Sequence, residues 1–248
     1  MSSTKPFNLR FSHTQRETPT VLSFFFNVES GALNFRAGNY LILRFRDLAD
    51  DPRGPMRQFS IASSPSESGS MLRIATTIEP DDSPFKRRLN GLKPSEPVEA
   101  LGPFGSFTID EARWKDSEVV LVGAGIGVTP LRSMLFKAAK LQLDSNLKLI
   151  HLARDPSEFV FAKEFDSLSS SYSRLNIWRI LSSPRADSPS QHVGSVELSA
   201  LSDIVEEMGS ALFYLSGPAG IVHALSQALS TTASVPHSNI RTERFTGY

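Results

Sequence analysis

Residues 118–130 read EVVLVGAGIGVTP. Val119 to Val122 form a continuous apolar run, which predicts a buried strand, and Thr129 opens a predicted helix that runs to about Leu143. Glycines between them let the backbone approach a ligand, and a helix N-terminus offers free N–H groups to a phosphate. The stretch predicts a nucleotide-binding loop. Its G-x-G-x-G spacing differs from the dinucleotide G-x-G-x-x-G, and a ligand-free turn is the alternative.

Downstream of this loop, strand patterns alternate with helix patterns. The predicted strands cover residues 147–152, 175–181, 212–215 and 240–245, and the predicted helices cover residues 158–168, 196–208 and 221–229. Such alternation predicts a doubly wound α/β domain with a parallel sheet, in which ligands bind at the carboxyl ends of the strands. A second strand-to-helix turn, residues 215–220, would then frame the same crevice as the first.

Upstream of the loop, short strands are separated by turn residues. The predicted strands cover residues 7–11, 21–28, 40–45, 58–62, 71–77, 98–101 and 106–109. This pattern predicts a small antiparallel β-barrel, interrupted by a short helix over residues 85–92. The chain is therefore predicted to have two domains, a barrel over residues 1–112 and an α/β domain over residues 113–248.

The composition limits the function further. The chain has 248 residues, 26 Lys plus Arg against 26 Asp plus Glu, and no cysteine. The balanced charge argues against a protein that mainly binds nucleic acid or an acidic membrane surface. Without cysteine, this chain supplies no disulfide, thiol nucleophile or cysteine-ligated iron–sulfur cluster. Its five histidines are scattered, so no metal site is predicted. No long apolar run or signal peptide is present, which predicts a cytoplasmic protein.

Six short motifs follow one another along the chain. In order, they are AGNY (37–40), RQFS (57–60), GPFGSF (102–107), GAGIGVTP (123–130), YLSGPAGIV (214–222) and TERF (242–245). In this order, on a barrel followed by a parallel sheet, they resemble the flavin and nicotinamide motifs of the ferredoxin–NADP reductase family. The resemblance spans nearly the whole chain and implies an FAD-binding barrel followed by an NAD(P)-binding domain.

The resemblance implies roles for residues of the barrel. Arg57 would neutralise the FAD pyrophosphate, Phe59 would pack against the flavin, and Ser60 would hydrogen-bond near its reactive nitrogen. Thr76 would help to hold the cofactor. The short helix would direct its N-terminal N–H groups at a phosphate, which favours FAD over FMN. The residues that open this helix are Ser83, Pro84 and Phe85.

The resemblance also implies roles for residues of the second domain. The residues that would meet the nicotinamide nucleotide are Gly127, Val128 and Thr129. Those that would line the other wall of the crevice are Gly217, Pro218 and Ala219. Arg154 and the loop residues Ser183 and Arg185 would read the adenosine 2′-phosphate, which favours NADPH over NADH.

Four residues are implied beside the reacting atoms: Ser60, Ser216, Glu243 and Phe245. Ser216 stands where the family usually has a cysteine, and its hydroxyl can still form a hydrogen bond. Phe245, or else Tyr248, would cover the flavin face and would move aside before hydride transfer.

The implied activity is that of an FAD-dependent NAD(P)H oxidoreductase, which passes a hydride from NAD(P)H to the flavin and then electrons to an acceptor. The acceptor would be a separate protein, such as a ferredoxin or an oxygenase component, or a small molecule. A basic cluster would favour an acidic protein partner: Arg53, Arg57, Lys86, Arg87 and Arg88. The alternatives are a reductase of free flavin or ferric chelates and a non-catalytic FAD-binding electron-transfer subunit.

Overall fold

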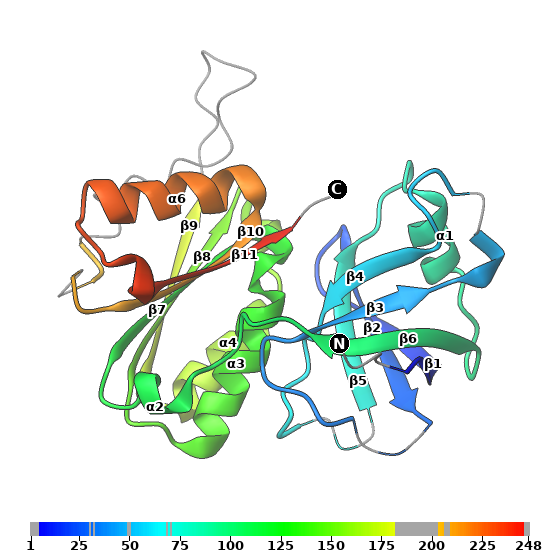
Figure 1. Cartoon of the computed structure of the whole chain (residues 1–248), viewed down its shortest axis with the longest axis horizontal. Coiled ribbons are helices and arrows are strands. Elements are labelled where there is room, and N and C mark those ends of the chain that lie inside the picture. The colour runs from blue at the N-terminus through cyan, green and yellow to red at the C-terminus, as the bar shows by residue number, and fades with distance from the viewer. Residues whose placement is uncertain are drawn as a thin grey trace, which may run out of the picture.

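The computed structural model describes residues 5–29, 31, 33–48, 51–67, 69, 71–181, 203–205 and 209–245. Within these residues the chain forms two domains that lie side by side, each built on one sheet (Figure 1). The first sheet is antiparallel and the second is parallel. The predicted fold class, a β-barrel followed by an α/β domain, is confirmed.

The first domain is a six-stranded sheet in the order β4-β3-β6-β1-β2-β5. Its strands are β1 (Phe7–Arg16), β2 (Val21–Val28), β3 (Tyr40–Arg44), β4 (Met56–Ser60), β5 (Met71–Thr77) and β6 (Pro97–Phe104). The outer strands β4 and β5 approach each other through an antiparallel bridge between Ile61 and Ile74. This bridge curls the sheet into a barrel, so that the edges that an open sheet would expose are joined.

Alternation along the strands fills the barrel. In β3, Leu41 and Leu43 are fully buried, whereas the residues between and beside them are only partly covered. The short helix α1 (Pro84–Asn90) covers one end of the barrel with buried Phe85 and Leu89. Ser83 caps this helix, because its hydroxyl accepts a hydrogen bond from the Lys86 N–H at 3.3 Å.

The second domain is a five-stranded parallel sheet in the order β11-β10-β7-β8-β9. Its strands are β7 (Glu118–Ala124), β8 (Asn146–Ala153), β9 (Leu175–Leu181), β10 (Leu212–Pro218) and β11 (Ile240–Phe245). Its helices are α2 (Glu111–Trp114), α3 (Val128–Leu141), α4 (Ala162–Ser171) and α6 (Ala219–Thr231). Helices α3 and α4 lie on one face of the sheet and α6 lies on the other (Figure 1).

Two local predictions were wrong. Residues 106–109 form no strand, because Gly105, at φ +101°, turns the chain out of the barrel after Phe104. Phe107 is instead buried in the cluster that contains Val119. The predicted helix over residues 158–168 begins later, at Ala162, because Phe161 has a left-handed backbone conformation, at φ +59°. Most of the predicted helix over residues 196–208 lies outside the described residues.

Candidate functional site

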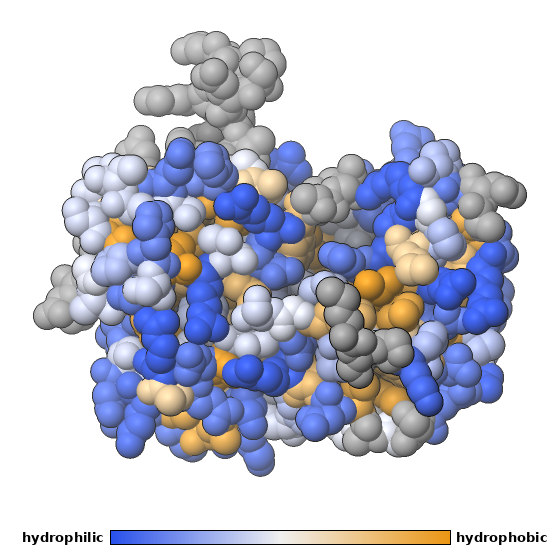
Figure 2. Space-filling model, in the orientation of Figure 1, coloured by the Kyte–Doolittle hydropathy of each residue, from blue (hydrophilic) through white to orange (hydrophobic). Residues whose placement is uncertain are grey.

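A cavity of about 440 Å³ lies between the two domains. The space-filling view shows the two lobes and the notch between them (Figure 2). Twelve of the residues that line the cavity belong to the barrel: Tyr40, Ile42, Arg53, Met56, Arg57, Gln58, Phe59, Ser60, Ala75, Thr76, Ser83 and Lys86. The second domain contributes Ile126, Thr129, Glu243, Arg244 and Phe245. The cavity volume is within the range of small-molecule sites, about 300–1,000 Å³.

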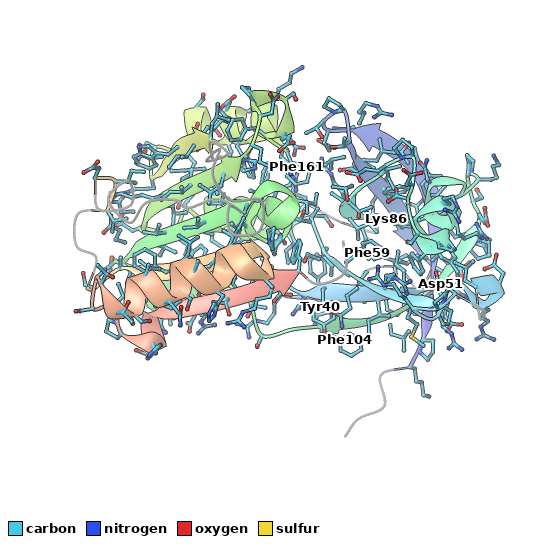
Figure 3. The ribbon with its side chains drawn as sticks, turned by 90° about the horizontal axis from the view of Figure 1, so that it is seen from above. Tyr40, Asp51, Phe59, Lys86, Phe104 and Phe161 are labelled. Carbon is cyan, nitrogen blue, oxygen red and sulfur yellow. The ribbon has the colours of Figure 1, made fainter. Side chains whose placement is uncertain are left out.

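The floor of the cavity on the barrel side is the outer face of β3 and β4. Tyr40 pairs with Ser60 and Ile42 pairs with Gln58, so these four side chains share one face of the sheet. Phe59 points the other way, into the barrel, where its ring stacks on Phe85 at a centroid distance of 6.0 Å. Figure 3 shows Tyr40 and Phe59 on the side of the barrel that is turned toward the second domain. The strand therefore presents a hydroxyl, an amide and apolar surface to a ligand.

Arg57 lies at the end of this floor and holds the loop that precedes its own strand. Its Nη1 donates to the carbonyls of Arg53 (2.9 Å), Gly54 (2.7 Å) and Met56 (2.7 Å), and its Nη2 lies 3.1 Å from the Asp51 carboxylate. The hydrogen bond from the Arg53 N–H and the nearby Arg57 guanidinium hold the pKa of Asp51 below its usual range. Arg57 thus positions the loop at the cavity as well as placing a positive charge beside it.

The N-terminus of α1 offers few free donors. Pro84 has no N–H, the Lys86 N–H is bonded to the Ser83 hydroxyl, and the Arg87 N–H is bonded to the Ser83 carbonyl at 3.0 Å. Phe85 supplies the remaining amide of this first turn. The Lys86 ammonium, 3.2 Å from Asp82 and 2.9 Å from the Thr77 hydroxyl, is the main positive group here.

Behind the second-domain wall of the cavity, the two glycine turns meet. A Cβ placed on Gly127 would lie 2.3 Å from the Ser216 carbonyl oxygen and 2.6 Å from the Gly217 Cα. Only glycine allows this approach, so the turns after β7 and β10 form one surface, as predicted from the parallel sheet. The Thr129 hydroxyl is fully buried and donates to the Ile126 carbonyl at 2.7 Å, which tightens the turn.

Ser216 lies in a row of paired residues that crosses the sheet. Its neighbours in register are Glu243 on β11 and Gly123 on β7, and the next residue in the row is His151 on β8. Ser216 is 2% exposed, and its hydroxyl has no hydrogen-bond partner among the described residues. Burial raises the pKa of the Glu243 carboxyl above its usual range. This row therefore places the unbonded Ser216 hydroxyl beside the Glu243 carboxyl, whose pKa is raised, at the edge of the sheet where the strands end.

The cavity brings together eight of the residues that the sequence singled out: Arg57, Phe59, Ser60, Thr76, Ser83, Thr129, Glu243 and Phe245. Other predicted residues do not line it: Pro84, Phe85, Gly127, Val128, Arg154, Ser216, Gly217, Pro218 and Ala219. Phe85 and Val128 are fully buried, whereas the Arg154 side chain is 83% exposed and lies 3.7 Å from Glu158. The predicted residues Ser183, Arg185 and Tyr248 lie outside the described residues.

Several lining residues were not predicted: Ile42, Met56, Gln58, Ala75, Ile126 and Arg244. Met56 and Gln58 alternate with Arg57 and Phe59, so the strand period could have identified them. The predicted basic cluster is largely neutralised. Arg88, for example, lies 2.8 Å from Asp47 and 2.5 Å from Glu96.

The residues present fit a dinucleotide with a ring and a pyrophosphate. Among the lining residues, four side chains are cationic and one, Glu243, is a carboxylate. Two of the four cations are already paired, Arg57 with Asp51 and Lys86 with Asp82, so the excess of positive charge that favours an anionic ligand is modest. The outer face of β3 and β4 supplies the apolar surface that a planar ring requires. Among the described residues, no group of three or more His, Asp or Glu side chains could hold a metal ion. No described helix is both long enough and apolar enough to cross a membrane.

Comparison with known proteins agrees with this geometry. Residues 121–227 match the family model of the oxidoreductase NAD-binding domain. The flavohemoprotein of Bacillus subtilis is 25% identical over 240 residues, which cover 94% of this chain and 57% of that relative. The chain thus spans little more than half the length of this relative.

Two solved structures share the fold. The FAD/NAD-binding domain of the nitric oxide dioxygenase from Vibrio cholerae superposes with a TM-score of 0.78 at 22% identity, over 96% of this chain and 98% of that one. The ferredoxin–NADP⁺ reductase from Plasmodium falciparum superposes with a TM-score of 0.81 at 16% identity, over 97% and 96%. Together with the matched domain, these findings confirm the predicted family resemblance and the prediction of an oxidoreductase. The predicted cofactors, FAD and a nicotinamide dinucleotide, agree with them.

Proposed function

We propose that this chain is an FAD-dependent NAD(P)H oxidoreductase, the function implied by its resemblance to the ferredoxin–NADP reductase family and by its match to the oxidoreductase NAD-binding domain. When bound, FAD would supply the redox chemistry, that is, hydride transfer from the nicotinamide and electron transfer to an acceptor. The observation that carries the proposal is the cavity itself. It joins Ser60 of the barrel to Thr129 and Glu243 of the domain that matches the NAD-binding family.

The barrel residues would hold the flavin cofactor. Tyr40 and Ile42 would support the ring on the outer face of the sheet, and the Ser60 hydroxyl would donate to a ring nitrogen. Lys86 and the loop fixed by Arg57 would face the pyrophosphate, with the Ser83 side chain beside it. Phe59 would support the flavin indirectly, because its ring packs on Phe85 behind the strand surface on which the flavin ring would lie.

The second-domain residues would hold the nicotinamide beside the flavin. The glycine turn at Gly127 and the opposed turn at Gly217 would receive the nucleotide, and the buried Ser216 hydroxyl would donate to it. Glu243, whose pKa is raised by burial, would retain or exchange a proton close to the reacting atoms. Phe245, the last residue of β11, lines the cavity. Its side chain would shield the flavin ring from water until the nicotinamide enters.

The preferred nucleotide and the acceptor are the finer parts of the proposal. We propose NADPH, because Arg154 is exposed at the carboxyl end of β8, and a guanidinium suits a 2′-phosphate. We propose a one-electron acceptor protein such as a ferredoxin, since the similar proteins include a ferredoxin–NADP⁺ reductase. The paired state of Arg57, Lys86 and Arg88 makes their cluster a poor docking surface for it.

An anaerobic titration of the FAD-loaded chain tests the proposal. We expect NADPH to bleach the flavin absorbance band stoichiometrically, and NADH to do so with a higher half-saturating concentration. Failure of both nucleotides to bleach the band would instead support the electron-transfer subunit. Loss of FAD on gel filtration, with turnover of added riboflavin, would support the free-flavin reductase.

A further inference from the structure

The guanidinium of Arg132 is buried between the two domains and uses every one of its donors. The residue is 4% exposed. Nη1 donates to the Ala62 carbonyl at 2.8 Å and to Glu67 at 3.0 Å, and Nη2 donates to the other oxygen of Glu67 at 3.1 Å. Nε donates to Glu164 at 2.9 Å, and Nη2 also bonds to Glu164. An arginine has five N–H donors, and all five are occupied here.

Glu164 joins this contact to a second buried arginine. Its other carboxylate oxygen lies 2.8 Å from Nη2 of Arg73, which belongs to β5 of the barrel. Arg73 is 5% exposed and also bonds to Glu17 at 2.6 Å. The Arg73 guanidinium stacks on Phe161 at 4.6 Å, and Figure 3 shows Phe161 at the face of the second domain nearest the barrel. Two arginines, one from each domain, thus share one carboxylate.

This network is one helical turn away from the nicotinamide side of the cavity. Arg132 follows Thr129 by three residues on α3, and the neighbouring Ser133 donates its hydroxyl to the Ser63 carbonyl at 2.8 Å. The two carbonyls that α3 holds, those of Ala62 and Ser63, come directly after Ser60 and Ile61 at the end of β4. A rigid helix therefore links the position of Thr129 to the position of Ser60 through a few short hydrogen bonds.

We propose that Arg132 is a positioning residue that fixes the separation between the nicotinamide wall and the flavin floor. The inference rests on the proposed hydride transfer from NAD(P)H to FAD. A displacement of about 1 Å between reacting groups can cost up to about 10²-fold in rate. Lysine cannot replace the arginine, because an ammonium has three donors and no planar fork to grip two carboxylates and a carbonyl together.

Stopped-flow reduction of the FAD-loaded chain by NADPH tests this role with Arg132→Lys. We expect the limiting rate at saturating NADPH to fall about tenfold or more, while the dissociation constant of FAD and the rate of reduction by dithionite stay within about twofold. Glu67→Gln, at a partly exposed position, is the milder variant and should lower the limiting rate about two- to fivefold. It decides the question if Arg132→Lys does not fold. Arg174→Lys is the matched control, because Arg174 pairs with Asp144 at an exposed site and neither residue belongs to the network.

A distance measurement gives a readout that does not depend on the reaction. The chain has no cysteine, so Lys93→Cys on the barrel and Gln227→Cys on α6 provide two specific spin-label sites, both exposed. We expect Arg132→Lys to broaden the distance distribution between them. A slower reduction with an unchanged distribution, or a broadened distribution with an unchanged rate, would overturn the positioning role. If neither nucleotide reduces the wild-type protein, the proposed function fails, and the distance distribution alone decides whether Arg132 fixes the domains.

Discussion

Phe59 and Ser60 are adjacent in β4, but they face opposite sides of the sheet. Phe59 is buried on Phe85 inside the barrel, and Ser60 faces the cavity together with Tyr40 and Gln58. Both residues of this motif line the cavity, but the ring of Phe59 packs inside the barrel whereas the side chain of Ser60 shares the outer face with Tyr40 and Gln58. The period of two in a strand causes this division, and it assigns the cavity side to Gln58 as well.

His151 gives a prediction about stability and pH. The residue is fully buried beside Phe159, and burial lowers the pKa of its ring from 6.5 to about 3. Between these two values the unfolded chain binds a proton that the folded chain excludes, so stability is complete above about pH 6.5 and falls as the pH falls toward 3. At pH 5 the loss relative to pH 7 is about 2 kcal/mol.

Urea unfolding at pH 7 and at pH 5 measures this loss. His151→Leu removes the titrating ring, so we expect its stability to fall by about 2 kcal/mol less than that of the wild type between the two pH values. His223→Gln, on the exposed side of α6, is the control and should keep the wild-type difference. Equal pH dependence of the wild type and His151→Leu would contradict the prediction.

Arg57 gives a prediction that separates charge from geometry. Its guanidinium bonds to two carbonyls of the loop before β4, to the carbonyl of Met56 at the start of β4 and to Asp51, so a fork of donors is required as well as a charge. We expect both Arg57→Ala and Arg57→Lys to raise the FAD dissociation constant about tenfold or more, since a charge-assisted hydrogen bond contributes about 1.5–3 kcal/mol. Fluorescence titration with FAD measures this constant.

Arg88→Lys is the matched control, since Arg88 pairs with Asp47 and Glu96 and does not line the cavity. Full affinity in Arg57→Lys would mean that the positive charge alone is needed and that the loop contacts do not matter for FAD.

At the scale of elements, the contact between the turns after β7 and β10 is the tightest in the site. Gly127→Ala would force a methyl group against backbone atoms at 2.3 and 2.6 Å, and neither backbone can yield like a flexible side chain. We expect a stability loss of about 1–3 kcal/mol and a strong loss of reduction by NADPH, with FAD affinity retained because the barrel is unchanged.

Thermal unfolding and NADPH titration of the same samples check both parts. Gly220→Ala is the control, because it lies in the first turn of α6 with no atom near its added methyl group, and alanine favours a helix. Wild-type stability and reduction in Gly127→Ala would show that the turns can separate without cost.

The elements themselves were largely predictable, and the exceptions have local causes. Hydrophobic period and turn residues identified β2 and β5 to the residue. Residues 106–109 were expected to be a strand because they include buried apolar residues. Phe107 is buried because it packs in the core of the second domain, not because it belongs to a strand of the barrel. A propensity pattern does not distinguish these two uses of a buried aromatic residue.

At the scale of the whole molecule, the sequence predicted each wall of the site but not how the walls are held together. The motifs identified Ser60, Thr129 and Glu243, which line one cavity. Arg73, Arg132 and Glu164 carry no motif, and they meet only because helix α3 packs against the end of β4. Contacts between residues so far apart in sequence depend on the tertiary arrangement of the domains.

The shared cavity predicts that FAD stabilises both domains together. A ligand that binds only the folded chain adds about 2.7 kcal/mol at a concentration 100 times its dissociation constant. For a chain of this size that corresponds to a rise of about 5–10 °C in Tm, and removal of FAD should lower Tm by the same amount.

Because Lys86 and Phe245 line the cavity from different domains, we expect one transition that moves as a whole when FAD is added. Calorimetry over an FAD series measures this, with riboflavin, which lacks the pyrophosphate and adenine, as the weaker control. Two transitions, of which FAD moves only one, would mean that the cofactor binds the barrel alone and that the cavity is not a joint site.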